Sequence, residues 1–158
     1  EFHSRVETPK LLLDRNQQLE KAITAEIEKG NIPIAITATA GTTDFGNVDP
    51  LTEIAHIANR HNLWLHVDAA YGCGLLLTDK YRGLLNGIEL AHSVTVDYHK
   101  SFFQPVSSSG FLVRDKNFFN LITHHADYLN PKDHDEDGLP NQVNKSIQTT
   151  RRFDALKL

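Results

Sequence analysis

The spacing of apolar residues near the start of the chain predicts an amphipathic helix. Between residues 14 and 30, apolar side chains recur at four-residue intervals among polar neighbours, at Leu19, Ile23 and Ile27. Asp14 and Gln17 have the spacing of a capping-box variant, so we expect this helix to begin at Asp14. Gly30 marks its expected end, because glycine is favoured just beyond the last helical turn.

Apolar runs of strand length alternate with helical patterns along the rest of the chain. Pro50 begins a second expected helix, which has Asp49 as its N-cap and ends near His61. Further helices are expected over residues 116–125 and from residue 149 onward. Strands are expected at residues 32–40, 63–68, 94–96 and 110–115. Because helical crossovers join parallel strands, the pattern predicts an α/β fold, a mainly parallel sheet with helices on both faces.

Composition and charge exclude several classes of function. The chain has 158 residues, of which 40% are hydrophobic, as is typical of one soluble domain. Its net charge of −4 does not indicate a basic surface for nucleic acid or anionic lipid. The chain lacks an apolar run near the roughly 18 residues that span a bilayer, and it does not start as a secretory leader does. We therefore expect a cytoplasmic protein without nucleic-acid or membrane partners. Cys73 is the only cysteine, which excludes an internal disulfide, and its surroundings do not indicate a nucleophile.

An acidic stretch, DHDEDG at residues 133–138, matches the first half of a calcium-binding loop. The twelfth position of such a loop carries glutamate, but here it is Asn144, and Pro140 stands where an apolar residue is expected. We therefore expect no metal site. Two other interpretations stay open: the acidic charges attract a cationic substrate, or they form a solvated face.

Two ionisable residues follow the apolar parts of predicted strands. Asp68 closes LWLHVD and precedes two alanines, and Lys100 lies 32 residues later, just after VTV. Ligands of α/β proteins bind at the carboxyl ends of strands. An amine and a carboxylate at that edge suit pyridoxal phosphate, since a lysine can form a Schiff base with its aldehyde and a carboxylate keeps its ring nitrogen protonated. By spacing alone, Asp68 could equally cap the next turn and Lys100 could be a solvated surface charge.

Longer motifs around these two residues favour the cofactor. The segments TATAGTTDFGNVDPL, WLHVDAAYGCGLLL, VDYHKSFFQP and QTTRRFDALKL, in this order and spacing, resemble the group II pyridoxal-phosphate-dependent amino acid decarboxylases. The resemblance implies the large domain of the aspartate-aminotransferase-like (type I) fold, and decarboxylation of an L-amino acid to its amine. VDYHKSFFQP is most similar to enzymes acting on L-2,4-diaminobutyrate, which implies 1,3-diaminopropane as product. The alternatives are a glutamate, aromatic amino acid or cysteine sulfinate decarboxylase, another type I enzyme such as an aminotransferase, or a domain without catalysis.

The resemblance also implies roles for individual residues. Lys100 is similar to the Schiff-base lysine, and His99 to the family's histidine near the cofactor phosphate. Asp68 matches the carboxylate paired with the pyridinium nitrogen, Ala70 the small residue against one ring face, and Thr43 the hydroxyl beside the ring. An alanine at position 70 is physically sensible, because a large side chain would fill the slot of the ring.

The resemblance further implies that residues 1–158 form a single, partial large domain. The upstream part with the main phosphate-binding loop and the C-terminal small domain are absent from the sequence. We therefore expect this segment alone to be inactive. The full-length parent is expected to be a homodimer that takes a small amino acid as substrate.

Overall fold

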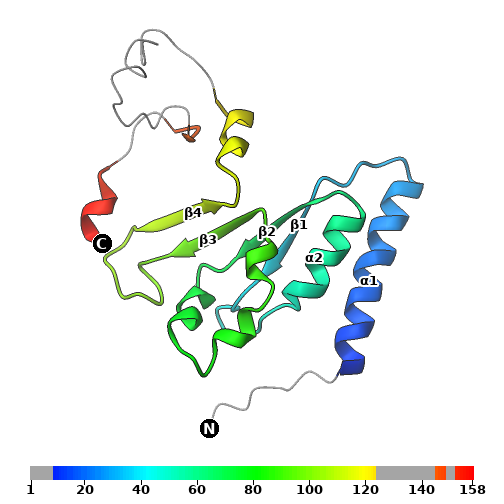
Figure 1. Cartoon of the computed structure of the whole chain (residues 1–158), viewed down its shortest axis with the longest axis horizontal. Helices are drawn as coiled ribbons and strands as arrows, with labels where there is room; N and C mark the ends of the chain where they lie inside the picture. Colours follow the sequence, from blue (N-terminus) through cyan, green and yellow to red (C-terminus); the bar gives the residue numbers. More distant parts are fainter. Residues whose placement is uncertain (1–8, 124–144, 149–151) are drawn as a thin grey trace.

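Four strands form one mixed sheet in the computed structural model of the chain, which describes residues 9–123, 145–148 and 152–158 (Figure 1). The strands lie in the order β1-β2-β3-β4 and span Ala35–Thr39, Trp64–Asp68, Ser93–Asp97 and Ser109–Val113. β2 pairs in parallel with both β1 and β3, whereas β4 runs antiparallel to β3. The predicted mainly parallel α/β fold is confirmed.

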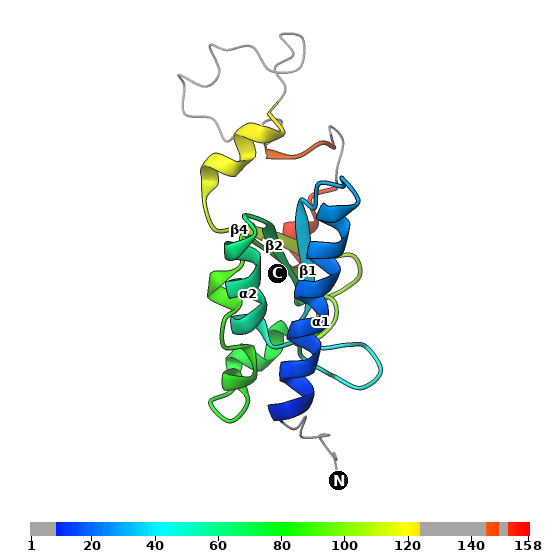
Figure 2. The same cartoon turned by 90° about the vertical axis from the view of Figure 1, so that its right-hand side faces the viewer.

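Two α-helices, α1 (Pro9–Glu28) and α2 (Leu51–Arg60), lie side by side (Figure 1 and Figure 2). Alternate strand residues point toward them, because side chains of a strand alternate between its faces. The buried core accordingly combines Ile36 and Ala38 of β1, Leu65 and Val67 of β2, Ile23 of α1, and the buried face of α2.

Short 3₁₀ helices complete the described part of the chain. Three of them, η1 to η3, lie between β2 and β3, and η4 and η6 follow β4; their bounds are Gly72–Leu77, Arg82–Leu85, Ile88–Leu90, Lys116–Leu121 and Asp154–Lys157. The helix expected over residues 116–125 is thus a 3₁₀ helix as far as it is described. Among the described residues, no helix has the length and apolar character needed to cross a bilayer.

Both predicted helix starts were wrong. α1 begins at Pro9, ahead of Asp14, since proline suits the first helical position and the residues after it continue the helical run. The cap residue of α2 is Pro50, without a side-chain cap. Asp49 instead accepts a hydrogen bond from the Thr39 amide at 2.7 Å, and its own amide donates to the Thr39 carbonyl. Asp49 therefore holds the loop after β1 against the sheet.

Candidate active site

The carboxyl ends of the three parallel strands meet at one edge of the sheet. Thr39 at the end of β1 is paired with Asp68 at the end of β2, and Asp68 with Thr95 of β3. Parallel strands present their carboxyl ends to the same side. The loops that follow β1 and β2, and the turn that follows β3, therefore start next to one another. The ends of these strands and the segments that follow them contain all five candidate residues predicted from the sequence.

Asp68 is held by main-chain contacts on both sides. Its carbonyl accepts from the amide of Ala40, and the amide of Ala69 donates to the carbonyl of Thr95. The Asp68 side chain also caps the next turn, because Oδ1 accepts from the Ala70 amide at 3.1 Å. Asp68 is nevertheless exposed, and Oδ2 has no hydrogen-bond partner within the described residues. The carboxylate thus combines the capping role with a free oxygen at the sheet edge.

Lys100 is exposed, and its amine is paired with a carboxylate. Lys100 Nζ lies 2.9 Å from Oδ2 of Asp97, the last residue of β3. The side chain of Asp97 is 14% exposed and that of Lys100 is 36% exposed. The other oxygen of Asp97, Oδ1, accepts from the Ser109 hydroxyl of β4 at 2.6 Å. Asp97 therefore orients the lysine at the end of the strand.

Asp97 was not among the residues predicted from the sequence to form the site. The available signal was an acidic residue at a strand end, three positions before a lysine in a turn. Burial raises the pKa of the Asp97 carboxyl, but hydrogen bonds from Ser109 and Lys100 and the charges of Lys100 and His99 outweigh it. The net result is a pKa below the usual range, so the carboxylate is ionised at neutral pH.

His99 is fixed by the loop that leads into β4. Its Nδ1 faces the main chain of Ser108, 2.8 Å from the carbonyl oxygen and 3.2 Å from the amide nitrogen. Nδ1 can donate to the first or accept from the second, according to its tautomer. Its Nε2 lies 3.8 Å from Asp97 Oδ2. The imidazole thus lies between the buried Ser108 and the ion pair of Asp97 and Lys100.

The remaining two candidates differ in their surroundings. Ala70 is 9% exposed and lies directly against the Asp68 cap. Thr43 is exposed on the loop after β1 and makes no hydrogen bond to the other four candidates. The structure therefore brings His99 and Lys100 into one cluster around Asp97 and places Asp68 and Ala70 on the adjacent strand end, with Thr43 further out.

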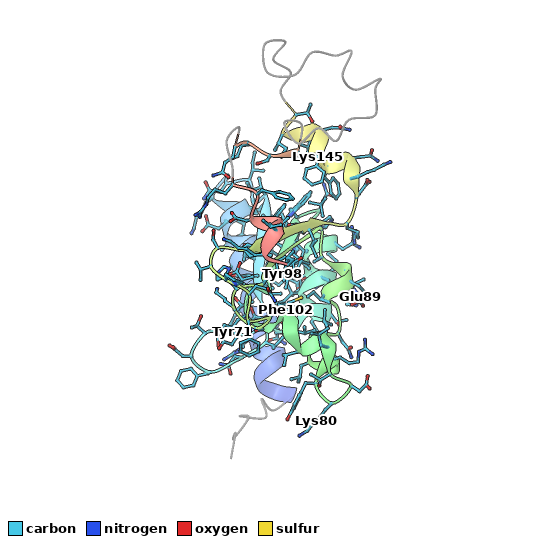
Figure 3. The ribbon with its side chains drawn as sticks, turned by 90° about the vertical axis from the view of Figure 1, so that its left-hand side faces the viewer. Tyr71, Lys80, Glu89, Tyr98, Phe102 and Lys145 are labelled. Atoms are coloured by element: carbon cyan, nitrogen blue, oxygen red, sulfur yellow. The ribbon has the colours of Figure 1, made fainter. Side chains whose placement is uncertain are left out.

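Aromatic rings flank the lysine turn. Tyr98 and Phe102 lie two positions either side of Lys100, and their ring centroids are 5.6 Å apart. Figure 3 labels both residues, together with Tyr71, which follows β2. A Cβ at Gly110 of β4 would lie 3.1 Å from the Tyr98 hydroxyl oxygen, so this ring packs closely on the β4 backbone. The turn that carries Lys100 is thus supported on its β4 side.

Other potential reactive groups do not form a second centre in the described part of the chain. Burial raises the pKa of the Cys73 thiol, which makes its thiolate scarce at neutral pH. Among the described residues, no group of three or more His, Cys, Asp or Glu could hold a metal ion. The acidic stretch at 133–138 lies outside the described residues.

Comparisons with known proteins agree with one another. A family model, the pyridoxal-dependent decarboxylase conserved domain, matches residues 6–158. The chain is 54% identical over 130 residues to an L-2,4-diaminobutyrate decarboxylase of Rhizobium meliloti (strain 1021), covering 82% of this chain and 26% of that protein. It is 46% identical over 140 residues to an L-2,4-diaminobutyrate decarboxylase of Acinetobacter baumannii, covering 89% and 28%. The chain therefore spans about a quarter of the length of these curated relatives.

The fold comparison points to the same group. The crystal structure of Oryza sativa TDC with PLP and tryptamine superposes with a TM-score of 0.81 at 29% sequence identity. The match covers 90% of this chain and 29% of that one. The likeness thus extends over nearly the whole chain.

Proposed function

The chain belongs to the pyridoxal-dependent decarboxylase family, and on this premise we propose that it is the lysine-bearing part of an enzyme that decarboxylates an L-amino acid. The cofactor of this family is pyridoxal phosphate. The observation that carries the proposal is the position of Lys100 and Asp68, which stand at the carboxyl ends of neighbouring parallel strands. We further propose that residues 1–158 are one partial large domain of a longer protein.

The residues at this sheet edge fit the cofactor in three respects. Lys100 offers a primary amine that is already oriented by Asp97. Asp68 offers a carboxylate oxygen that is not used by the described residues. Ala70, next to the Asp68 cap, has a small side chain, whereas a larger one would occupy the space that a flat ring needs. An aldehyde, a ring nitrogen and a flat ring are the parts of pyridoxal phosphate that such groups would meet.

Each candidate residue then has a role. Lys100 would attach the cofactor covalently, and Asp68 would hold a proton on the ring nitrogen through an ion pair. When bound, the cofactor supplies an electron sink for the charge that develops as carbon dioxide leaves. Ala70 would contact one ring face and Thr43 would lie beside the ring. His99 would stand near the phosphate, with its orientation fixed by Ser108.

Asp97 prepares the lysine for this role. In the structure it holds the Lys100 ammonium with an oxygen 2.9 Å from Nζ. An amine attacks an aldehyde only in its neutral form, so a proton has to leave Nζ before attachment. Two further contacts of Asp97, with the Ser109 hydroxyl and with the neighbouring His99, do not involve Lys100. Asp97 would therefore hold the turn in place before and after the lysine has reacted.

We propose L-2,4-diaminobutyrate as the substrate and 1,3-diaminopropane as the product. The support is the similarity of VDYHKSFFQP to enzymes of that specificity, together with the two diaminobutyrate decarboxylases among the relatives. A glutamate, aromatic amino acid or cysteine sulfinate decarboxylase is the alternative within the same family. We also propose that the full-length protein is cytoplasmic and that it forms a homodimer, and light scattering on the purified protein would test the dimer.

The decisive experiment uses the full-length protein. Amine release is measured for diaminobutyrate, glutamate, an aromatic amino acid and cysteine sulfinate, and the attached cofactor is trapped with borohydride and mapped by mass spectrometry. We expect release from diaminobutyrate and a label on Lys100 that Lys100→Ala abolishes. Lys21→Ala, at an exposed position of α1, serves as the control.

Two results would count against the proposal. A label that persists at another lysine in Lys100→Ala would overturn the assignment of the lysine. A preference for another amino acid by more than about tenfold in kcat/KM, or about 1.4 kcal/mol, would overturn the substrate but leave the decarboxylase proposal standing.

A further inference from the structure

The turn that carries Lys100 touches the segment that follows Asp68 at a point beyond the sheet. The Ser101 hydroxyl donates a hydrogen bond to the carbonyl of Tyr71. The same side chain packs against Gly74 of η1, where an added Cβ would lie 2.8 Å from the Ser101 Cβ. Two segments that are 27 residues apart in sequence are therefore joined by a hydrogen bond and by a close steric contact.

The close packing on Ser101 requires a glycine at position 74, whereas the backbone conformation there does not. Glycine is often selected because a positive φ is unfavourable for other residues. Positive φ values occur at Gly30, Gly41, Gly46 and Gly87, but not at Gly74. A Cβ at position 74 would collide with an atom bonded directly to the Ser101 main chain, which a rotamer change cannot move away. An alanine there would have to displace the turn itself.

The contact of Ser101 lies beyond the last paired residues of β2 and β3. The last paired residues of β2 and β3 are Asp68 and Thr95. Beyond them, a long hydrogen bond of 3.3 Å joins the Asp97 amide to the Ala70 carbonyl. Ser101 adds the outermost contact, directly after Lys100. It therefore joins the turn with the lysine to the segment that follows Asp68.

A comparable contact holds the loop of Thr43 against the loop after β2. A Cβ at Gly72 would lie 2.1 Å from the Ala40 carbonyl oxygen, to which the Gly72 amide donates a hydrogen bond at 3.0 Å. The same Cβ would also lie 3.2 Å from the Gly41 Cα, so Gly41 packs against Gly72 as well. Successive loops at this edge are thus spaced by contacts that a glycine makes possible.

We infer that Ser101 is a positioning residue, which through its packing on Gly74 and its hydrogen bond to Tyr71 sets the distance between Lys100 and Asp68. The inference rests on the proposed function, because this distance matters only if both residues hold the same cofactor. A cofactor attached to Lys100 and paired with Asp68 has a fixed length between its aldehyde carbon and its ring nitrogen. Moving the turn outward would separate at least one of the two groups from its partner.

The test is a rescue experiment in the full-length protein. Gly74→Ala introduces the collision, and the double variant Gly74→Ala with Ser101→Gly removes the atom it meets. Ser101→Ala keeps the packing but loses the hydroxyl. Gly83→Ala is the matched control, because an added Cβ at Gly83 meets nothing within 4 Å and its φ is not positive. The readouts are the dissociation constant of pyridoxal phosphate, the absorption spectrum of the bound cofactor and thermal unfolding of the cofactor-free protein.

We expect Gly74→Ala to weaken cofactor binding about tenfold or more and to change the absorption spectrum, and the added Ser101→Gly to restore both toward wild type. Ser101→Ala should weaken binding by about fivefold, as loss of one neutral hydrogen bond does. Gly83→Ala should bind as wild type does. If Gly74→Ala does not fold, Ser101→Ala and the double variant decide the matter through the same spectrum and dissociation constant.

The outcomes separate this inference from the proposed function. A wild-type protein that binds no pyridoxal phosphate overturns both. A wild-type protein that binds it, with a Gly74→Ala variant that binds equally well, overturns the role of Ser101 alone. The same holds if the double variant binds no better than the folded Gly74→Ala protein.

Discussion

The Lys100 amine is paired with Asp97 on its own strand end, 2.9 Å away, and not with Asp68 on the neighbouring strand. The two carboxylates at this edge therefore have separate tasks. Asp97 is 14% exposed and orients the amine, whereas Asp68 is exposed and leaves one oxygen without a partner among the described residues. This separation is what a lysine and a carboxylate need if they are to hold opposite ends of one molecule.

The pair of Asp97 and Lys100 should make stability depend on acidity. A carboxyl group whose folded pKa is depressed stabilises the protein above its unfolded pKa of about 3.9, and this contribution is lost as the pH falls through the folded pKa. We expect Asp97→Asn to lower the unfolding free energy by about 1 kcal/mol at neutral pH, and by less below about pH 4. Urea unfolding over this pH range measures it. Asp44→Asn, at an exposed loop position, should leave the unfolding free energy unchanged at every pH.

Replacing Asp68 should reduce the turnover number more than it reduces cofactor attachment. An unprotonated ring nitrogen would make a poorer electron sink, whereas the proposed covalent bond to Lys100 would not depend on that proton. We expect Asp68→Ala to keep bound cofactor and to lose roughly 10²–10³ in turnover number, the usual cost of removing one electrostatic contact to developing charge. Absorbance of the bound cofactor and steady-state kinetics measure the two effects. Asp79→Asn is the control, since that side chain is fully exposed, and an unchanged turnover number in Asp68→Ala would contradict the role.

Much of this fold follows from short-range patterns. The four strands lie where alternation and apolar runs predicted them, since a buried strand must place apolar side chains on its core face. Helix starts were less predictable because a capping residue can bond elsewhere. Asp49 illustrates this: its carboxylate is bonded to the Thr39 amide, a contact that depends on how the loop returns to β1.

The candidate site was predictable only in part for the same reason. Asp68 and Lys100 stood out because each closes or follows a strand. Asp97, the partner of Lys100, could not be predicted, because the direction of a side chain in a turn depends on contacts such as that with Ser109 of β4. The contact of Ser101 with Gly74 was harder to predict, because its prediction requires knowledge of both the strand order and the path of η1.

His92 should make the protein less stable in mild acid. Its Nδ1 accepts from the Leu65 amide at 2.9 Å, and its ring stacks on Trp64. Burial lowers the pKa of His92, and the charge of Arg114 lowers it further. The unfolded chain then binds more protons below about pH 6.5, so stability falls as the pH drops from there through the folded pKa.

The test replaces His92 by asparagine, which removes the titrating ring but keeps a hydrogen-bond acceptor for the Leu65 amide. We expect His92→Asn to show a flatter dependence of the unfolding free energy on pH between about 5 and 7 than wild type. His56→Asn, at an exposed position of α2, should retain the wild-type slope. Equal slopes in wild type and His92→Asn would show that another group titrates.

The isolated 158-residue chain should self-associate and should not turn over substrate. Within the described residues β4 pairs only with β3, and Phe111 and Leu112 are 58% and 53% exposed on its two faces. An open edge strand with apolar side chains pairs readily with another chain. Light scattering at micromolar concentration should detect oligomers. Leu112→Lys should reduce the oligomers. Leu121→Lys, at an exposed position of η4, should not reduce them. A monomer with the turnover of the full-length protein would show that the segments expected to bind the phosphate are dispensable.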